Sequence, residues 1–201
     1  MPDRPPRSFF QRDAVTLARA LLGQRLVRID HGRRLAGTIV EVEAYLGVID
    51  QAAHTYNGRR TPRNEAMYGK GGTAYVYFTY GLHHCLNVVA QSHDHPEAVL
   101  LRAIEPTEGL EVMRPRRAAA RRDADLCSGP AKLCQALRID RALNGVDLRS
   151  GDALFLEQTR RRALPGRQIA VGPRVGIDYA GAWRDKPLRF WVRGNPHVSR
   201  R

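Results

Sequence analysis

The sequence predicts a single domain of the α+β class, and three observations support this fold class. A chain of 201 residues, 43% of them hydrophobic, is long enough to bury a core and too apolar to be disordered. Segments that alternate between apolar and polar residues outnumber segments with helical spacing. Neither an internal repeat nor a linker divides the chain. We therefore expect a flexible, proline- and arginine-rich N-terminal segment over residues 1–8 and one domain over residues 9–201.

The first elements are a helix and a hairpin. Residues 13–22 carry one apolar stripe, and Gly23 is a typical helix stop. Strand patterns over 26–29 and 35–45 flank a turn at 30–32. Strict alternation in the second strand places side chains on two faces. One face would carry Thr38, Val40, Val42 and Ala44, and the other Ile39, Glu41, Glu43 and Tyr45.

The rest of the chain predicts further strands, two helices and one long loop. Residues 47–72 are polar and rich in turn signals, and a loop of this length is more often functional than idle. The remaining expected strands cover 73–80, 85–91, 98–104, 153–156, 174–177 and 188–192. The expected helices cover 110–122, which carries five arginines and Pro115, and 130–136, which opens with proline.

Charge is the strongest compositional signal. The formal net charge is +13, and Lys70, Lys132 and Lys186 are the only lysines, so arginine supplies most of it. A GC-rich genome explains arginine in place of lysine, but it leaves the excess over Asp and Glu unexplained. So basic a domain is typical of a protein that binds nucleic acid, with an anionic membrane surface as the weaker alternative.

Cysteine usage and hydropathy indicate where in the cell we expect the protein. Three cysteines without CxxC spacing indicate free thiols in a reducing cytoplasm. The sequence shows neither a signal peptide nor an apolar run of the ~20 residues that a membrane span needs. Histidines occur in pairs but without a surrounding ligand set, so we expect neither a metal nor another cofactor.

The segment from Glu41 to Tyr45 is the first candidate for chemistry. Glu41 and Glu43 would project from one strand face, with Tyr45 after them, directly before the long loop. Either glutamate could also be an ordinary solvated side chain. His54 lies in the loop, where a lone histidine is more often a surface or capping residue than a catalyst.

Two further patterns stand out. Tyr75 and Tyr77 would share one face of an aromatic strand that ends in Tyr80 and Gly81, and tyrosines on a basic protein can stack on bases or simply pack a core. Asn87 and Arg102 each interrupt an apolar strand. A buried arginine needs an anionic partner, so Arg102 would pair with a buried glutamate, either to hold a catalytic base or as a purely structural ion pair.

Taken together, these segments resemble the alkyladenine (3-methyladenine) DNA glycosylase family. The resemblance runs from about residue 8 to residue 200 in the family's order. It is carried by IVEVEAYLG (39–47), AAH (52–54), RTPRN (60–64), GTAYVY (72–77), YG (80–81), LNV (86–88), VLLRAIEP (99–106), LCSGPAKLCQAL (126–137), RVG (174–176) and KPLRF (186–190).

The resemblance implies a role for individual residues. It makes Glu43 the base that activates the attacking water, with Arg102 and the backbone near Val175 as partners. Tyr45 and His54 would form one wall of a base pocket and Tyr77 the opposite wall. Tyr80 would wedge into the gap left by a flipped nucleotide, and Asn87 would exclude normal guanine.

The resemblance also implies the fold and the reaction. The expected fold is one mixed domain around a curved, largely antiparallel sheet, with a hairpin that intercalates into DNA. The expected function is that of a monomeric, cytoplasmic, monofunctional glycosylase that flips alkylated or deaminated purines out of duplex DNA and leaves an abasic site. The segments 82–84 and 91–97 differ from the family pattern beside that hairpin. The competing hypothesis is a non-catalytic nucleic-acid-binding protein on the same scaffold; a purely structural domain explains neither the charge nor the aromatic run.

Overall fold

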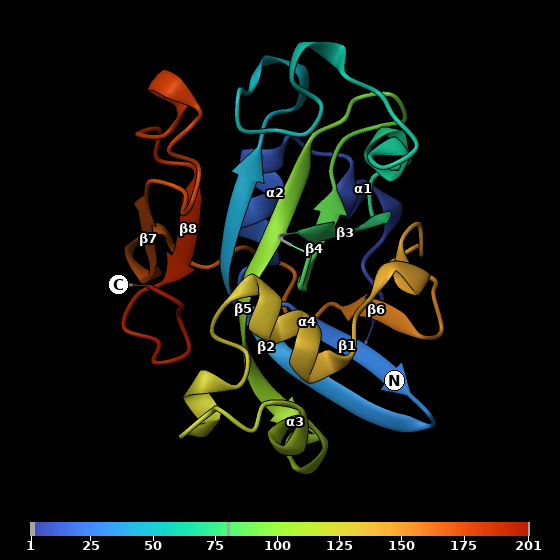
Figure 1. Ribbon diagram of the computed structural model, residues 1–201, viewed down its shortest axis with the longest axis vertical. Helices are drawn as coiled ribbons and strands as arrows, with labels where there is room; N and C mark the ends of the chain where they lie inside the picture. Colours follow the sequence, from blue (N-terminus) through green and yellow to red (C-terminus); the bar gives the residue numbers. More distant parts are fainter. Residues whose placement is uncertain (1–2, 80, 201) are drawn as a thin grey trace.

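The structure, a computed structural model, describes residues 3–79 and 81–200. Within these residues eight strands form one antiparallel sheet that curls around a core, with short helices packed against it (Figure 1). The strand order is β3-β4-β5-β2-β1-β6, and β8 branches from β2 and pairs with β7. This confirms the expected α+β fold around a curved antiparallel sheet.

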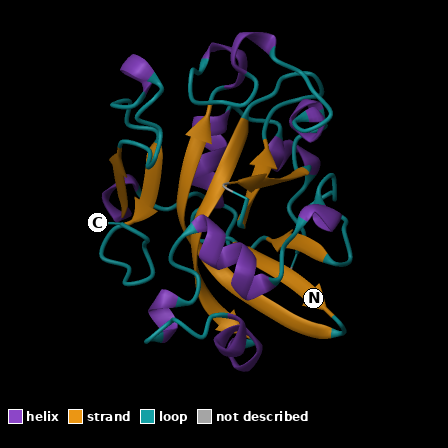
Figure 2. Ribbon diagram, in the orientation of Figure 1, coloured by secondary structure: helices purple, strands orange, loops and turns teal. Residues whose placement is uncertain are grey.

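The α-helices are few and short in comparison with the strands, and Figure 2 also draws short 3-10 helices in the connecting loops as purple segments. Two precede the sheet, α1 (Arg7–Phe10) and α2 (Ala14–Leu21), and two follow its central strands, α3 (Leu110–Arg116) and α4 (Pro130–Leu137). The Asp13 side chain caps α2 by accepting from the Thr16 N–H, and Gly23 follows the helix at φ +84°. The expected helix over 13–22 is therefore confirmed.

Two long strands occupy the centre of the sheet. The strands in chain order are β1 (Arg25–Asp30), β2 (Arg33–Tyr45), β3 (Ala74–Thr79), β4 (His83–Val89), β5 (Ala98–Glu108), β6 (Leu154–Glu157), β7 (Ile169–Gly172) and β8 (Arg189–Val192). His31 and Gly32 both have positive φ, as a tight two-residue β-hairpin turn requires, and they join β1 to β2. Beyond Ile39, β2 lies between β5 and β8.

Strict alternation fails in β2 because the ladder with β5 contains bulges. Ile39 pairs with Ile104 and Glu41 with Ala103, so Val40 is an extra residue. The bulge turns Ile39 to the same core as Val42 and Ala44, away from the face on which we expected it. Arg102 is in turn an extra residue of β5, between Leu101 and Ala103. The two bulges thus reshape the sheet at the residues of chemical interest.

Two expectations for the remaining elements were wrong, and two elements were missed. The helix expected over 110–122 ends at Arg116, directly after Pro115, whose ring nitrogen cannot donate to the helix ladder. Residues 174–177 do not form a strand, because Gly176 has φ +74° and the Val175 N–H bonds to a side chain. The strand Ile169–Gly172 and helix α1 were not expected.

The N-terminal segment contacts the domain where the structure describes it. The Asp3 carbonyl accepts from the Gln158 N–H, Arg4 lies 3.3 Å over the Phe155 ring, and Arg7 pairs with Asp147. The flexibility of residues 1–8 remains a prediction.

Candidate active site

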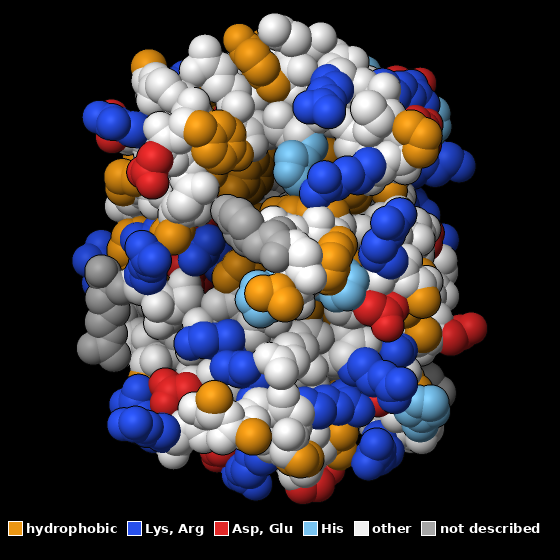
Figure 3. Space-filling view, in the orientation of Figure 1, with side chains coloured by type: hydrophobic (Ala, Val, Ile, Leu, Met, Phe, Trp, Pro, Cys, Tyr) orange, Lys and Arg blue, Asp and Glu red, His pale blue; other side chains and the backbone are white. Residues whose placement is uncertain are grey.

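A cavity of about 300 Å³ opens where β2, β3, β4 and β5 meet the loops that follow β2 and β7. Its lining includes Arg102, which we expected as the partner of Glu43, together with the five residues that we expected to form a base pocket: Tyr45, His54, Tyr77, Asn87 and Val175. These residues come from distant parts of the chain, and Tyr45 and Val175 are 130 positions apart in the sequence. The hollow lies on a face over which Lys and Arg side chains are widely spread (Figure 3).

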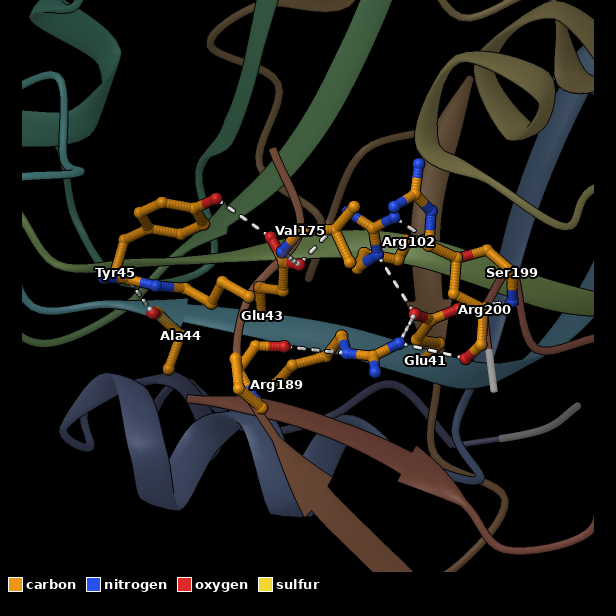
Figure 4. A network of polar contacts seen from close by, with 11 residues as sticks. Glu41, Glu43, Ala44, Tyr45, Arg102, Val175, Arg189, Ser199 and Arg200 are labelled. Atoms are coloured by element: carbon orange, nitrogen blue, oxygen red, sulfur yellow. Dashed lines mark hydrogen bonds and ion pairs between the residues drawn. The ribbon is translucent and has the colours of Figure 1, made fainter. Parts of the chain in front are cut away.

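Glu43 lies directly behind the wall of this cavity. Its side chain is fully buried, and its three partners all line the cavity (Figure 4). Glu43 Oε1 accepts from the Val175 N–H at 2.7 Å and lies 3.1 Å from Arg102 Nη1. Oε2 accepts from the Tyr45 hydroxyl at 2.9 Å. The carboxylate is therefore held in one orientation by donors from three separate segments.

Burial and charge act in opposite directions on this carboxylate. Loss of hydration raises the pKa of Glu43 above its ordinary value, and the nearby charge of Glu41 adds to the rise. Arg102, the Val175 N–H and the Tyr45 hydroxyl lower the pKa, but only in part. Such an environment is typical of a general base, because a carboxylate with a raised pKa accepts a proton more readily.

The aromatic lining is built from β3 and the loop after β2. The rings of Tyr75 and Tyr77 lie 5.4 Å apart on the same face, as expected. His54 contacts both: its Nδ1 is 2.8 Å from the Tyr75 hydroxyl, and its ring lies edge-on to Tyr77 at 4.6 Å. We expected His54 on the wall of Tyr45, opposite Tyr77. The structure instead places it against Tyr77, because the long loop folds back over β3.

His54 and the three tyrosines of the lining that surround it or face Glu43 are neutral near pH 7. Burial and the charges of Arg63 and Arg59 lower the pKa of His54 to about 4. Burial raises the pKa of Tyr75 to about 12 and raises that of Tyr77 and Tyr45 as well. The cavity therefore presents uncharged rings beside one buried, ion-paired arginine.

Asn87 contributes a polar edge to the same cavity. Its side chain is 4% exposed, and its amide nitrogen donates to the Tyr75 carbonyl at 3.2 Å. This bond fixes the amide in the wall of the cavity.

A buried ion pair supports both loops of the site. Arg174 and Asp50 have fully buried side chains and form two hydrogen bonds, at 2.5 and 2.9 Å. Arg174 also donates to the Ala44 carbonyl and lies 4.6 Å from the centre of the Tyr45 ring. The pair joins the loop after β2 to the segment that carries Val175.

Several supporting residues were missed from the sequence. Arg189 donates to Glu41 at 3.0 Å, and the Ser199 N–H donates to the same carboxylate at 2.6 Å. Arg189 interrupts the apolar run 188–192, the same signal that pointed to Arg102. Asp50 and Ser199 lie in irregular polar segments, which carry no comparable signal.

The hairpin between β3 and β4 is present, but its expected wedge, Tyr80, lies outside the described residues. Phe78 and Leu82, which flank that position, are 40% and 76% exposed. Large apolar side chains are thus presented to solvent at this turn. Whether the hairpin enters DNA remains a prediction.

The arginine cluster of residues 114–122 is largely paired with acids. Arg114 bonds to Asp123 and Arg122 to Asp125, each at 2.9 Å, and Arg116 pairs with Asp30. In the described ranges no three His, Cys, Asp or Glu side chains are grouped to hold a metal ion. Over the same ranges, none of the helices has the length and apolar character to cross a membrane.

Comparison with known proteins identifies the family. The model of the methylpurine-DNA glycosylase family matches residues 8–196. The chain is 50% identical to the DNA-3-methyladenine glycosylase of Mus musculus over 95% of its own length and 60% of that protein's. It is 49% identical to the human protein of the same name, over 95% and 66% of the two lengths. A putative 3-methyladenine DNA glycosylase of Clostridium acetobutylicum is 48% identical over 96% of both chains.

Matches of this extent, on this fold and around this cavity, define the class of protein as a DNA glycosylase, a hydrolase of N-glycosyl bonds. The chain belongs to the methylpurine-DNA glycosylase family.

Proposed function

We propose that the protein removes alkylated and deaminated purines from duplex DNA by hydrolysis of the N-glycosyl bond, with a water activated by Glu43. The observation that carries this proposal is the buried Glu43 carboxylate, held by Arg102, Val175 and Tyr45 directly behind an aromatic cavity. A cavity of about 300 Å³ is at the lower end of the range for small-molecule sites and suits a single flipped base.

The neutral rings suit a damaged purine that carries positive charge. Alkylation at N3 or N7 makes the base cationic, and the faces of tyrosine rings attract cations by about 0.5–2 kcal/mol per contact. One face of Tyr45 is already covered by Arg174, so the base would stack on the other. Asn87 would exclude normal guanine by crowding its exocyclic amine.

Glu43 retains the capacity to bind a water. Each carboxylate oxygen has two acceptor sites, and Oε2 has the Tyr45 hydroxyl as its hydrogen-bond partner. A water that donates to the second site of Oε2 would lie beside the Tyr45 hydroxyl, which lines the cavity. Glu43 would take its proton, and the negative charge would stabilise the oxocarbenium-like sugar.

His54 is a poor candidate for protonating the departing base. With a pKa near 4 it is uncharged at neutral pH and can only offer or accept hydrogen bonds. Cationic lesions need no such acid, because alkylation already improves the leaving group. Neutral lesions such as hypoxanthine would therefore be hydrolysed more slowly than alkylated purines.

Access to the base requires the DNA to open. We expect Tyr80, which lies between β3 and β4 in the sequence, to fill the gap left by the flipped nucleotide, as inserted side chains do in other minor-groove complexes. The exposed Phe78 and Leu82 beside it support this role for the hairpin. Surface arginines would neutralise phosphates, and the protein would act as a cytoplasmic monomer.

The lysines favour a monofunctional reaction. A Schiff-base mechanism needs an amine at the sugar, and among the described residues no lysine lines the cavity. We expect borohydride to trap no covalent adduct with lesion-containing DNA. A trapped adduct would show that an amine attacks the sugar and that strand cleavage follows.

Base release from defined duplexes tests the function itself. Duplexes that carry 3-methyladenine, 7-methylguanine, hypoxanthine or ethenoadenine are incubated with the protein, and abasic products are resolved on a gel after alkali. We expect release of at least one alkylated purine. A protein that binds these duplexes but releases none of the bases would be the non-catalytic alternative.

A further inference from the structure

Glu41 is a second fully buried carboxylate, two residues before Glu43 on β2. Three donors from three segments hold it (Figure 4). Its Oε1 accepts from Arg102 Nε and from Arg189 Nη1, each at 3.0 Å, and its Oε2 accepts from the Ser199 N–H at 2.6 Å. The side chain is therefore part of the interior, in contrast to the solvated residue that a glutamate on a strand usually is.

Arg102 connects the two carboxylates. Its Nε donates to Glu41, its Nη1 lies 3.1 Å from Glu43, and its Nη2 donates to the Ser199 hydroxyl at 3.2 Å. All three nitrogens of the guanidinium have a partner, so its plane is fixed. Without Glu41, the Nε of Arg102 would lose its anionic partner and the guanidinium could turn toward Glu43.

The cluster holds two negative and two positive charges. Glu41 and Glu43 balance Arg102 and Arg189, and the exposed fraction of each of the four side chains is below 10%. Buried ion pairs are weak contributors to stability, because apolar packing of similar volume performs as well. A four-charge cluster behind a reaction cavity is therefore better explained by its effect on the chemistry.

We propose that Glu41 is a positioning residue for the reaction: it takes up the charge of Arg189 and holds the Arg102 fork, and so preserves the strength of Glu43 as a base. The inference rests on the proposed function of Glu43. Glu41 itself does not line the cavity and would not contact the substrate.

The charge balance predicts the sign of the effect. The groups that face Glu43 are Glu41 and Tyr45 from β2, Arg102 from β5, Tyr77 from β3, and Cys85 from β4. The Glu41 charge raises the pKa of Glu43, and Arg102 lowers it. Removing the charge of Glu41 would therefore make Glu43 a weaker base, and removing that of Arg189 would have the opposite effect.

Two variants of opposite charge test this inference. The single-turnover rate of base release is measured from pH 4.5 to pH 9 for wild type, Glu41→Gln and Arg189→Met; methionine retains much of the apolar stem of arginine. The acid limb of this profile is the pH range in which the rate falls as the pH is lowered. We expect it to shift to lower pH in Glu41→Gln, and we expect the maximal rate of that variant to be reduced on the order of tenfold. In Arg189→Met we expect the limb to shift to higher pH.

Glu105→Gln is the matched control. Glu105 lies on β5 and binds the same C-terminal segment through Asn195, at 2.8 Å, but it is outside the cluster. The acid limb of Glu105→Gln should coincide with that of wild type. Limbs that stay in place in both cluster variants, or shift in the same direction, would overturn the proposal.

Failure of the inference can be told apart from failure of the proposed function. If wild type releases base and Glu43→Gln does not, the proposed function stands. The acid limbs of Glu41→Gln and Arg189→Met then show whether Glu41 is a positioning residue. If Glu41→Gln does not fold, the acid limb of Arg189→Met alone tests the inference. An acid limb that stays at the wild-type pH in this variant contradicts the positioning role of Glu41.

Discussion

At the scale of single residues, the site depends on the carboxylate of Glu43. Burial raises the pKa of this group, and the charge of Arg102 lowers it. Glu43 is removed from water, yet it has an arginine, an amide and a hydroxyl as partners. A carboxyl group that was buried without these partners would be protonated and neutral. A fully exposed carboxylate would have an ordinary, lower pKa and would be a weaker base. The arrangement keeps the pKa of Glu43 raised by burial while Arg102, the Val175 N–H and the Tyr45 hydroxyl stabilise its ionised form.

The pH dependence of base release follows from this environment. The pKa of Glu43 is raised, chiefly by burial, so the active ionised form is lost as pH falls through that raised value. We expect the acid limb of the single-turnover rate at a higher pH than an ordinary glutamate would give. Burial lowers the pKa of His54 to about 4, so His54→Gln should leave the acid limb in place. A limb that moves with His54 would assign the base to the histidine.

At the scale of elements, bulges and irregular segments place the chemistry. Val40 and Arg102 are the extra residues of the β2–β5 ladder, and the second bulge lies at the arginine that contacts Glu43. The segment after β7 leaves the ladder, which frees the Val175 N–H for the carboxylate. Regular strands would have directed these groups elsewhere.

The loop that follows β2 depends on the buried pair of Asp50 and Arg174. Asp50→Asn leaves the Arg174 charge buried without its anion, so we expect the free energy of unfolding to fall by about 3–5 kcal/mol. Urea unfolding measures the change. The control is Glu65→Gln, which breaks the exposed pair with Arg60 and should alter stability little. Equal small effects in both variants would show that the buried pair does not support the loop.

Most elements could be predicted from the sequence, and the exceptions have physical causes. The apolar stripe over 13–22, the glycine stop after α2 and the turn at 30–32 are local signals, and each was confirmed. The bulge at Val40 depends on a partner strand about 60 residues away, so alternation alone placed Ile39 on the wrong face. Likewise, β7 forms through its pairing with β8, and its short sequence carries little signal.

The site could be predicted in part. Glu43, Arg102 and the lining residues lie in segments that resemble a family, and the structure places Arg102 in the lining of one cavity with Glu43 directly behind it. The supporting residues Asp50, Arg174 and Ser199 could not be chosen, because only the folded chain pairs Arg174 with Asp50 and places Ser199 beside Glu41. Their functional roles remain predictions.

At the scale of the whole molecule, charge and shape favour a polyanion. The net charge is +13, and positive side chains are spread over the face that contains the cavity (Figure 3). The acidic residues that pair with the arginines of segment 114–122 reduce the contribution of that region. Phosphate contacts would therefore come mainly from other arginines, such as Arg59 and Arg63 near His54.

Binding to duplex DNA should depend strongly on salt. Each neutralised phosphate releases counterions, so we expect affinity to fall on the order of 100-fold or more between about 50 and about 200 mM salt. Fluorescence anisotropy with an undamaged duplex measures the slope. An affinity that changes less than about threefold would show that phosphate contacts contribute little.

The most direct test of the proposed mechanism is the single-turnover rate of base release by Glu43→Gln on a 7-methylguanine duplex, with DNA affinity measured in parallel. Glutamine retains the size of the side chain and the hydrogen bond from Val175, but it cannot accept the proton of water. We expect release to fall by about 100-fold or more, while DNA affinity stays within about threefold of wild type. Release at the wild-type rate would contradict the assignment of Glu43 as the base.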